Sequence, residues 1–511
     1  MKIMRSLDNV AAARNRPALA LSGVLAAAGI LLIYYSQSIA FTWDAGFHLL
    51  AVQLINSGKR PYLDFIFPQT PLNVWWMAFW MRVFGQSWRV AQALAALATT
   101  GAVILASTFV FRRFPIPEWR LPAAITTAVI FSLNELAFRW GTIPQAYGIC
   151  LFLTVAAFRL ALWIPERRGI WVPAAVGLLA GAAAGCSLLS AAAAPVLLVW
   201  IAVQSRGGNR WTKSVAFLVA AAIPFLPLVR LFVEGPHQTW FNIFQYQTLY
   251  RHANWGNTAG HDLGEMSGWL DSSQALVLLV LCVCALWFLR RPKSNAEAEV
   301  RDINAQDIKA NTRAEFYLCG WMALGLGLEE GLAHPTFTRY FVLTIPFAAM
   351  LAGPGLYQLT ARLTGGAPRR AVPVLLLTVL TAMGAGRAIY DNSEVYRWRD
   401  MQKVAAKIRQ VTPPGAALYA NEPLYFLMHW PPPEGMQFAY SRDLDLPAAE
   451  SAQLHIVRQK DLDKQVEAGR FATVVVCTDQ DTVDRLKLTS LYRKNDEVEY
   501  CKIFWDWGPG K

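Results

Sequence analysis

The chain has 511 residues, of which 55% are hydrophobic and only 16% are charged. So low a charged fraction is unusual in a soluble protein, and the composition therefore predicts a membrane protein. The formal net charge is +12, but the basic residues lie in alternate loops between apolar segments, which reflects membrane topology and not nucleic-acid binding. The sequence has no CxxC, HExxH, GxSxG or Walker spacing, so zinc proteases, serine hydrolases and nucleotide-hydrolysing enzymes lack support.

Apolar runs recur along the chain almost to residue 389, and each is near the length that crosses a ~30 Å hydrocarbon core as a helix. The first run lacks a small-residue cleavage site and predicts a retained helix, not a removed signal peptide. The run 171–203 is long enough for two short helices but is not obviously divided. We predict a polytopic α-helical membrane protein with about eleven spans, over 18–38, 90–111, 122–137, 146–164, 171–187, 188–203, 214–233, 273–289, 315–333, 338–358 and 371–389.

Lys and Arg in short loops favour the cytoplasmic side of a membrane. With the N-terminus inside, the basic clusters alternate as that rule requires: Arg5, Arg14 and Arg16; Arg112, Arg113 and Arg120; Arg167 and Arg168; Arg206, Arg210 and Lys213; Arg290, Arg291 and Lys293; Arg362, Arg369 and Arg370. We expect a multi-pass protein of the cytoplasmic membrane. Its segments 39–89, 138–145, 234–272 and 334–337, and the tail from about 390, then lie outside.

The tail differs in character from the rest of the chain. Apolar residues at helical spacing over 394–410, the β-rich runs "AALYA" and "FATVVVC", and the polar helical stretch 450–469 predict a small α/β domain. We divide the chain into a membrane part, 1–389, with its external loop 39–89, and an extracytoplasmic domain, 390–511. Cys477 and Cys501 fall in that domain and can pair if the compartment is oxidising; the sequence leaves this open.

The first external loop, "FTWDAGFHLLAVQLINSGKRPYLDFIFPQTPLNVWW", combines polar residues with many aromatics. Asp44 and His48 are four residues apart and share one face of a helix. The stretch "GKRPYLDF" interrupts that helix and brings Asp64 back to the membrane surface. The following "PQTPLNVWWMAFWMRVFG" predicts an aromatic-rich helix at the interface, the depth that Trp and Tyr prefer.

Asp44 and Asp64 each have two interpretations. Asp44 can be the N-cap of its helix, and Asp64 can be a turn residue after Pro61. Alternatively, a carboxylate immediately outside the first span is well placed to act on a substrate whose lipid tail stays in the bilayer. The position of Asp44, next to Trp43 and an aromatic floor, favours the second interpretation.

The loop also resembles the first external loop of the GT-C glycosyltransferases, the superfamily of the protein O-mannosyltransferases, the lipid A aminoarabinose transferase and the RgtA/B/C/D-like enzymes. Those loops contain an acidic residue after the first helix, then "G-x-x-PY-x-D", "PPL-x-x-W" and "FG-x-S-x-x-x-x-R". The matching residues here are Asp44, Gly58, Pro61, Tyr62, Asp64, Pro71, Leu72, Phe84, Gly85, Ser87 and Arg89. The stretch "HPTFTRYFVLTIPFAAML", 334–351, is similar to a late "RY-x-x-x-x-x-P" helix start of the same family.

The resemblance implies transfer of a sugar from a polyprenyl-phosphate donor to a lipid, glycan or protein acceptor on the outer face, with inversion at the anomeric carbon. One carboxylate would deprotonate the acceptor hydroxyl, while positive charge would stabilise the leaving phosphate. Asp44 is the candidate general base and Asp64 the second catalytic candidate. The candidate substrate-binding residues are His48, Tyr62, Gln69, Gln145, Arg251, His334, Arg339 and Tyr340.

Arg339 is the best candidate for the phosphate, because a guanidinium grips phosphate bidentately; the alternative is an interfacial arginine that only snorkels to the membrane surface. The external loop 234–269 adds His237, Tyr246, Tyr250, Arg251, His252, Trp255, His261 and Asp262. These residues can bind a divalent metal or recognise a sugar. Their spacing follows no known ligand pattern, which favours substrate recognition.

The chain also departs from the family pattern. Ala45 stands where many relatives have Glu, Gln69-Thr70 stands where the lipid A transferase type has Lys, and Gln145 occupies the place of a second carboxylate. These departures argue against a metal site built from two Asp and a Lys. Two other functions remain: a polyprenyl-linked glycan flippase, for which paired broken helices are missing, and a non-catalytic scaffold for envelope assembly.

Overall fold

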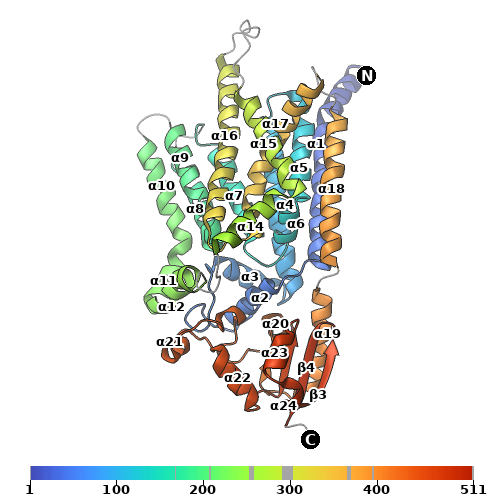
Figure 1. Ribbon diagram of the computed structural model, residues 1–511. Coiled ribbons are helices and arrows are strands. Elements are labelled where there is room, and N and C mark those ends of the chain that lie inside the picture. Colours follow the sequence, from blue (N-terminus) through green and yellow to red (C-terminus); the bar gives the residue numbers. More distant parts are fainter. Residues whose placement is uncertain are drawn as a thin grey trace.

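The computed structural model describes residues 2–166, 169–205, 209–251, 258–290, 303–364, 370–393 and 396–508. Long helices stand side by side as a bundle, and a smaller domain that ends the chain packs against one end of it (Figure 1). The N-terminus lies at the opposite end of the molecule from the C-terminus. Two short helices, α2 (Trp43–Asn56) and α3 (Leu72–Phe84), lie between the bundle and the C-terminal domain.

The remaining helices of the membrane part are α1 (Lys2–Ser38), α4 (Trp88–Arg113), α5 (Arg120–Ser132), α6 (Glu135–Trp140), α7 (Tyr147–Ala161), α8 (Trp171–Cys186), α9 (Ala193–Gln204), α10 (Arg210–Ala222), α11 (Leu226–Glu234), α12 (Pro236–Trp240), α14 (Thr258–Leu270), α15 (Ser273–Arg290), α16 (Ile303–Leu332), α17 (Ile345–Thr364) and α18 (Ala371–Ser393). Short 3₁₀ segments are η1 (Pro117–Trp119), η2 (Leu188–Ser190), η4 (Ile223–Phe225) and η7 (Thr338–Thr344), and η5 (Phe241–Tyr250) is a π-helix.

Each predicted apolar run contains a helix. Within the described residues, 6 segments are long and apolar enough to cross a membrane: Arg16–Ser38, Trp88–Arg113, Arg210–Glu234, Ser273–Arg290, Thr338–Thr364 and Ala371–Asp391. Three shorter apolar helices, Tyr147–Ala161, Trp171–Cys186 and Leu188–Gln204, lie among them. The uncertain run 171–203 is divided at Ser187, whose extended φ of −157° ends α8. The total of eleven spans remains a prediction.

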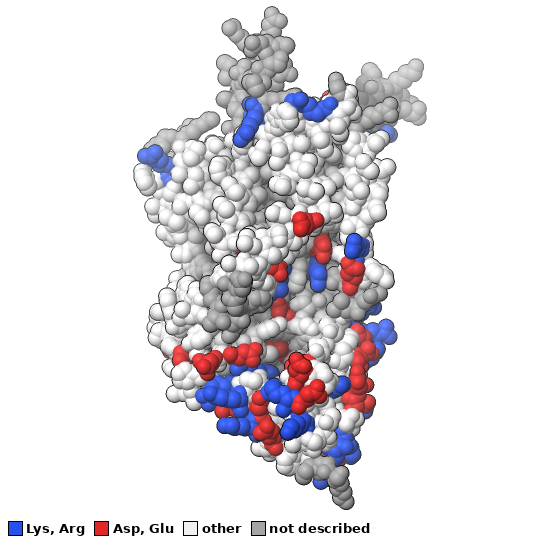
Figure 2. Space-filling model, viewed as in Figure 1, with Lys and Arg blue, Asp and Glu red and all other residues white. Residues whose placement is uncertain are grey.

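The surface of the bundle has the character of a lipid-facing belt. Large apolar side chains such as Val199, Leu218 and Leu375 are exposed along it. Figure 2 shows a band almost free of charged residues, with a few Lys and Arg at one end and a dense mixture of both signs over the C-terminal domain. This distribution is the one a multi-pass membrane protein requires, because charged side chains at mid-bilayer are costly.

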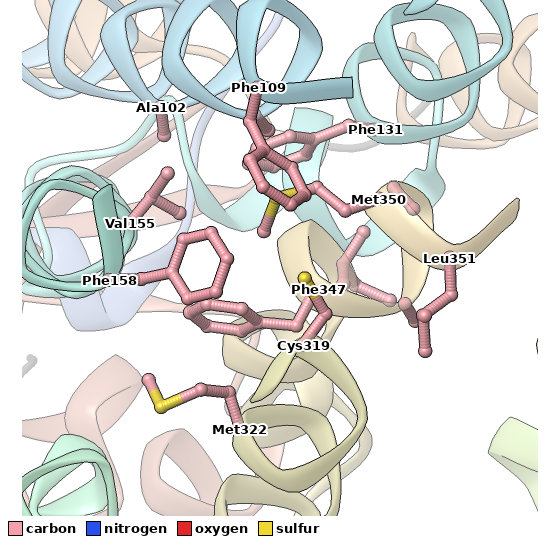
Figure 3. Close-up of a cluster of buried hydrophobic side chains, with 14 of the residues drawn as sticks. Ala102, Phe109, Phe131, Val155, Phe158, Cys319, Met322, Phe347, Met350 and Leu351 are labelled. Carbon is pink, nitrogen blue, oxygen red and sulfur yellow. The ribbon is translucent and has the colours of Figure 1, made fainter. Parts of the chain in front are cut away.

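Inside the bundle, aromatic and aliphatic side chains from α4, α7, α16 and α17 fill a continuous apolar core (Figure 3). The ring of Phe158 lies 5.2 Å from that of Phe109 and 5.7 Å from that of Phe347, both edge-on. Ring pairs in this geometry gain roughly 0.5–1.5 kcal/mol beyond the area they bury. The core therefore ties early and late helices of the chain together.

The C-terminal domain contains a 4-stranded sheet in the order β1-β2-β4-β3. β1 pairs parallel with β2, whereas β4 pairs antiparallel with both β2 and β3. Cys477 and Cys501 lie opposite each other on β2 and β4 and form a disulfide. The helices and strands of the C-terminal domain are α19 (Trp398–Val411), β1 (Leu418–Tyr419), α20 (Glu422–Met428), η8 (Ala439–Ser441), α21 (Ala448–Gln453), α22 (Gln459–Glu467), β2 (Thr473–Cys477), α23 (Gln480–Arg485), α24 (Leu488–Leu491), β3 (Tyr492–Val498) and β4 (Cys501–Trp507).

The first external loop and the C-terminal domain share one apolar core, which includes residues of α2, α3, α19, α20 and β4. Helices α2 and α20 approach so closely that a Cβ on Gly46 would lie 2.4 Å from Cγ of Pro423. The side chain of Gln53 donates to the carbonyl of Trp430 at 3.2 Å, and His455 Nε2 lies 2.7 Å from the carbonyl oxygen of Leu63. The domain is therefore packed onto the loop and is not a freely tethered module.

Candidate active site

Asp44 lies in the first turn of α2, immediately after the helix that begins the chain. Its Oδ2 is 3.4 Å from Nη2 of Arg339, and its Oδ1 accepts a hydrogen bond of 3.2 Å from the hydroxyl of Tyr440. The side chain is 22% exposed. The N-cap of α2 is Thr42, so the capping interpretation of Asp44 is wrong. An acidic side chain in this turn is still favoured by the helix dipole.

Arg339 belongs to η7, and its guanidinium lies 4.3 Å from the centre of the Phe337 ring. Arg251, at the end of η5, lies 5.1 Å from the centre of the same ring. Nη2 of Arg251 donates to the hydroxyl of Tyr340 at 2.9 Å. Two predicted substrate-binding arginines, from segments far apart in sequence, thus meet at Phe337, and their charges make this region attractive to an anion.

A clamp formed by α14 fixes the segment that leads into Arg339. The carboxylate of Asp262 accepts from the backbone N–H of Thr336 at 2.7 Å and contacts Nδ1 of His334. Glu265 Oε2 accepts from the backbone N–H of Thr338 at 2.7 Å and from its hydroxyl at 2.5 Å. These bonds bracket Phe337 on both sides. Predicted residue His334 is therefore held by Asp262, where it helps to fix the segment.

Asp64, the second catalytic candidate, is engaged by Arg60. It accepts from the backbone N–H of Arg60 at 2.7 Å and from its guanidinium at 3.1 Å, and Arg60 also bridges to Glu234 at 3.0 Å. The hydrogen bonds from Arg60 lower the pKa of Asp64 below its ordinary value. Asp64 is thus linked through Arg60 to Glu234 of α11, and these hydrogen bonds go to Arg60 and not to Asp44 or Arg339.

His48 lies inside the protein, where it is 1% exposed between the rings of Phe47 and Phe67. Burial lowers its pKa to about 3. This burial corrects the prediction that His48 contacts the substrate. His48 shares a helix face with Asp44, but the C-terminal domain covers α2 beyond its first turn. Tyr62 is likewise buried, and its hydroxyl donates to the carbonyl of Gln69 at 2.6 Å, which closes the loop.

Gln69 and Gln145 are the remaining predicted substrate-binding residues. The side chain of Gln69 is half-buried, and Gln145 is buried immediately before α7. Their proposed substrate contacts remain predictions. His252 and Trp255 of the loop 234–269 lie outside the described residues.

The sequence did not single out Tyr440 or Phe337. Tyr440 is separated from Asp44 by 396 residues, and nothing near it in the sequence marks it as part of a site. Phe337 lies within the "HPTFTRY" stretch, but its place between two basic residues of the folded site is not apparent from that stretch. The C-terminal domain therefore contributes directly to the surroundings of Asp44.

The residues around Asp44 do not fit a divalent metal. Such ions take several oxygen ligands, whereas the partners of Asp44 are a guanidinium and a donating hydroxyl. Across the described part of the chain, no three His, Cys, Asp or Glu side chains gather as a metal site would need. The groups present at Asp44 instead suit proton transfer to a carboxylate, with arginine side chains supplying the positive charge.

No family model and no curated protein sequence matches the chain. Several solved structures, however, match the fold of the chain. ArnT from Cupriavidus metallidurans bound to undecaprenyl phosphate superposes with a TM-score of 0.67 at 15% identity, over 95% of this chain and 98% of that one. Its apo form gives a TM-score of 0.68 at 14% identity over the same shares. The apo oligosaccharyltransferase of Archaeoglobus fulgidus gives 0.52 at 12% identity, over 93% of this chain and 73% of that one. The chain therefore shares its overall fold with ArnT along nearly the whole length of both chains.

Proposed function

We propose that the chain is a membrane glycosyltransferase that moves a sugar from a polyprenyl-phosphate donor to an acceptor at the outer face of the cytoplasmic membrane. The observation that carries the proposal is the pairing of Asp44 with Arg339 at the end of the helix bundle that faces the C-terminal domain, in a chain with the fold of ArnT. The ArnT structure with this fold holds undecaprenyl phosphate, which supports a polyprenyl phosphate as the carrier. The acceptor is a hydroxyl of a lipid, glycan or protein.

In the proposed reaction, Asp44 takes the proton of the acceptor hydroxyl while that oxygen attacks the anomeric carbon of the donor sugar. The bond between this carbon and the phosphate oxygen breaks on the opposite side, so the anomeric configuration inverts. The electron pair leaves with the polyprenyl phosphate. Arg339 and Arg251 are placed to stabilise that leaving charge, because guanidinium groups bind phosphate bidentately.

The ion pair between Asp44 and Arg339 also suggests an order of events. A donor phosphate carries negative charge and competes with Asp44 for the guanidinium. When Arg339 turns to the phosphate, the Oδ2 atom of Asp44 becomes available to the acceptor hydroxyl. The base would then be released only when the donor is in place.

The outward orientation of the site is part of the proposal. It rests on the alternation of basic loops along the sequence. The disulfide between Cys477 and Cys501 supports it, since disulfides persist in oxidising compartments outside the cytoplasm. In this orientation the substrate reaches Asp44 from the outer leaflet and needs no nucleotide on the cytoplasmic side.

The decisive experiment is the substitution Asp44→Asn. Asparagine keeps the shape and the hydrogen-bond acceptor for Tyr440 but loses basicity. We expect turnover to fall about 10²–10⁴-fold, the usual contribution of a general base, with the melting temperature unchanged. The measurement uses purified protein with a labelled pool of polyprenyl-phosphate sugars and membrane acceptors.

Asp445→Asn is the matched control, because Asp445 is exposed on the C-terminal domain and should behave as wild type. Near-normal turnover by Asp44→Asn would refute the assignment of the base. Wild-type protein that carries the labelled lipid across vesicles without transferring its sugar would favour the flippase instead.

A further inference from the structure

Tyr440 reaches the catalytic carboxylate from a different part of the chain. It lies in η8 of the C-terminal domain, and its hydroxyl donates to Oδ1 of Asp44 at 3.2 Å. Arg339 contacts the other oxygen, Oδ2. The two oxygens of the carboxylate thus have separate partners, one from the membrane bundle and one from the C-terminal domain.

The turn that carries Tyr440 is firmly held. Oε1 of Glu422 accepts from the backbone N–H of Ala439 at 2.6 Å, and the hydroxyl of Ser441 donates to the carbonyl of Phe438 at 2.7 Å. Phe438 itself packs edge-on against Phe47, with ring centres 5.0 Å apart. Since Phe47 is on the same helix as Asp44, the Tyr440 turn and the base are fixed to one another through a short path of packed residues.

We propose that Tyr440 is the positioning residue of the general base, and that the C-terminal domain completes the active site through it. The inference rests on the proposed function. Once Arg339 turns to the donor phosphate, Tyr440 still holds Oδ1 of Asp44 and directs Oδ2 at the acceptor hydroxyl. Tyr440 is 54% exposed, so its bond to Asp44 lies at the protein surface and is not part of the apolar core.

The hydrogen bond from Tyr440 acts on Asp44 together with the charges of neighbouring groups. The titratable and charged groups that interact with Asp44 are Arg339 from η7, Tyr147 from α7, Tyr246 from η5, Glu422 from α20 and Tyr440 from η8. A hydrogen bond donated to a carboxylate favours its ionised form. Removing the Tyr440 hydroxyl therefore takes away one donor that favours the ionised carboxylate and leaves the other four groups in place.

The test is Tyr440→Phe in the full-length purified protein. We expect kcat to fall about tenfold to a hundredfold, the effect of losing a hydrogen bond to a charged group, while the KM for the labelled polyprenyl-phosphate sugar stays unchanged. The acid limb of the pH–rate profile should move to higher pH, because the carboxylate has then lost a hydrogen bond that favours its ionised form.

Tyr500→Phe is the matched control. The Tyr500 hydroxyl donates to Asp400 at 2.8 Å in the same domain, so this variant loses the same kind of bond away from the site and should keep both kcat and the pH profile. A Tyr440→Phe enzyme with wild-type kcat and pH profile, beside an inactive Asp44→Asn, would overturn the role of Tyr440 alone. A higher acceptor KM with unchanged kcat would also overturn it, in favour of acceptor binding. An active Asp44→Asn would instead refute the proposed function itself.

Discussion

At the scale of a single residue, His48 should make the protein sensitive to acid. Burial lowers its pKa to about 3, so the folded protein keeps it neutral at pH values where the unfolded chain, with a pKa near 6.5, binds a proton. The unfolded state then binds more protons, and the free energy of unfolding falls as pH drops below about 6.5, by up to about 1.4 kcal/mol per pH unit. We expect the melting temperature in detergent to fall less steeply between pH 7 and pH 5 for His48→Leu than for wild type; parallel curves would contradict this.

The residues of the site divide into those that sequence could predict and those that it could not. Asp44 and Arg339 are both candidates from the sequence, and the structure brings the two side chains together; each adjoins an apolar run, and such boundaries place side chains at the same depth of the membrane. His48 was misassigned because four-residue spacing defines a helix face but not what covers it. Tyr440 could not be predicted from the sequence, since only the docking of the C-terminal domain brings it to Asp44.

At the scale of elements, α14 should control the segment that presents Arg339. Asp262→Ala would leave the buried backbone N–H of Thr336 without its acceptor, at a cost of about 1–3 kcal/mol. We expect a lower melting temperature and a loss of transfer activity, since Phe337 and Arg339 lie one and three residues after Thr336. Thermal melts and the labelled-donor assay check this. Asp271→Ala, an exposed position just beyond the same helix, is the control, and equal melting of the two variants would argue against the clamp.

Elements with strong periodicity or long apolar runs were predicted well, and the others were not. The spans, the helix after Pro71 and the strands at 418–419 and 473–477 follow from local pattern. The division at Ser187 and the π-helix η5 do not, because both depend on the neighbours that these segments pack against. Strands β3 and β4 were also not predicted, because the mostly polar β3 forms by pairing with β4, and β4 forms by pairing with the distant β2.

At the scale of the whole molecule, the orientation in the membrane is open to a direct measurement. A reporter active only outside the cytoplasm and fused after Lys511 should be active, because the basic loops alternate so as to leave the C-terminal domain outside. The same reporter fused after Arg113, at the predicted inner end of α4, should be inactive. A stable but inactive fusion after Lys511 would mean that the chain crosses the membrane an even number of times and not the predicted odd number.

The apolar core shared by the first external loop and the C-terminal domain has a consequence for biogenesis. The loop leaves the ribosome early, whereas β4, which belongs to the same core, is among the last segments to be made. Every intervening membrane helix must be inserted before the two can meet. A nascent chain halted before residue 398 would already have its bundle in the membrane, yet Asp44 would still lack Tyr440, so the proposed transfer activity should arise only after translation ends.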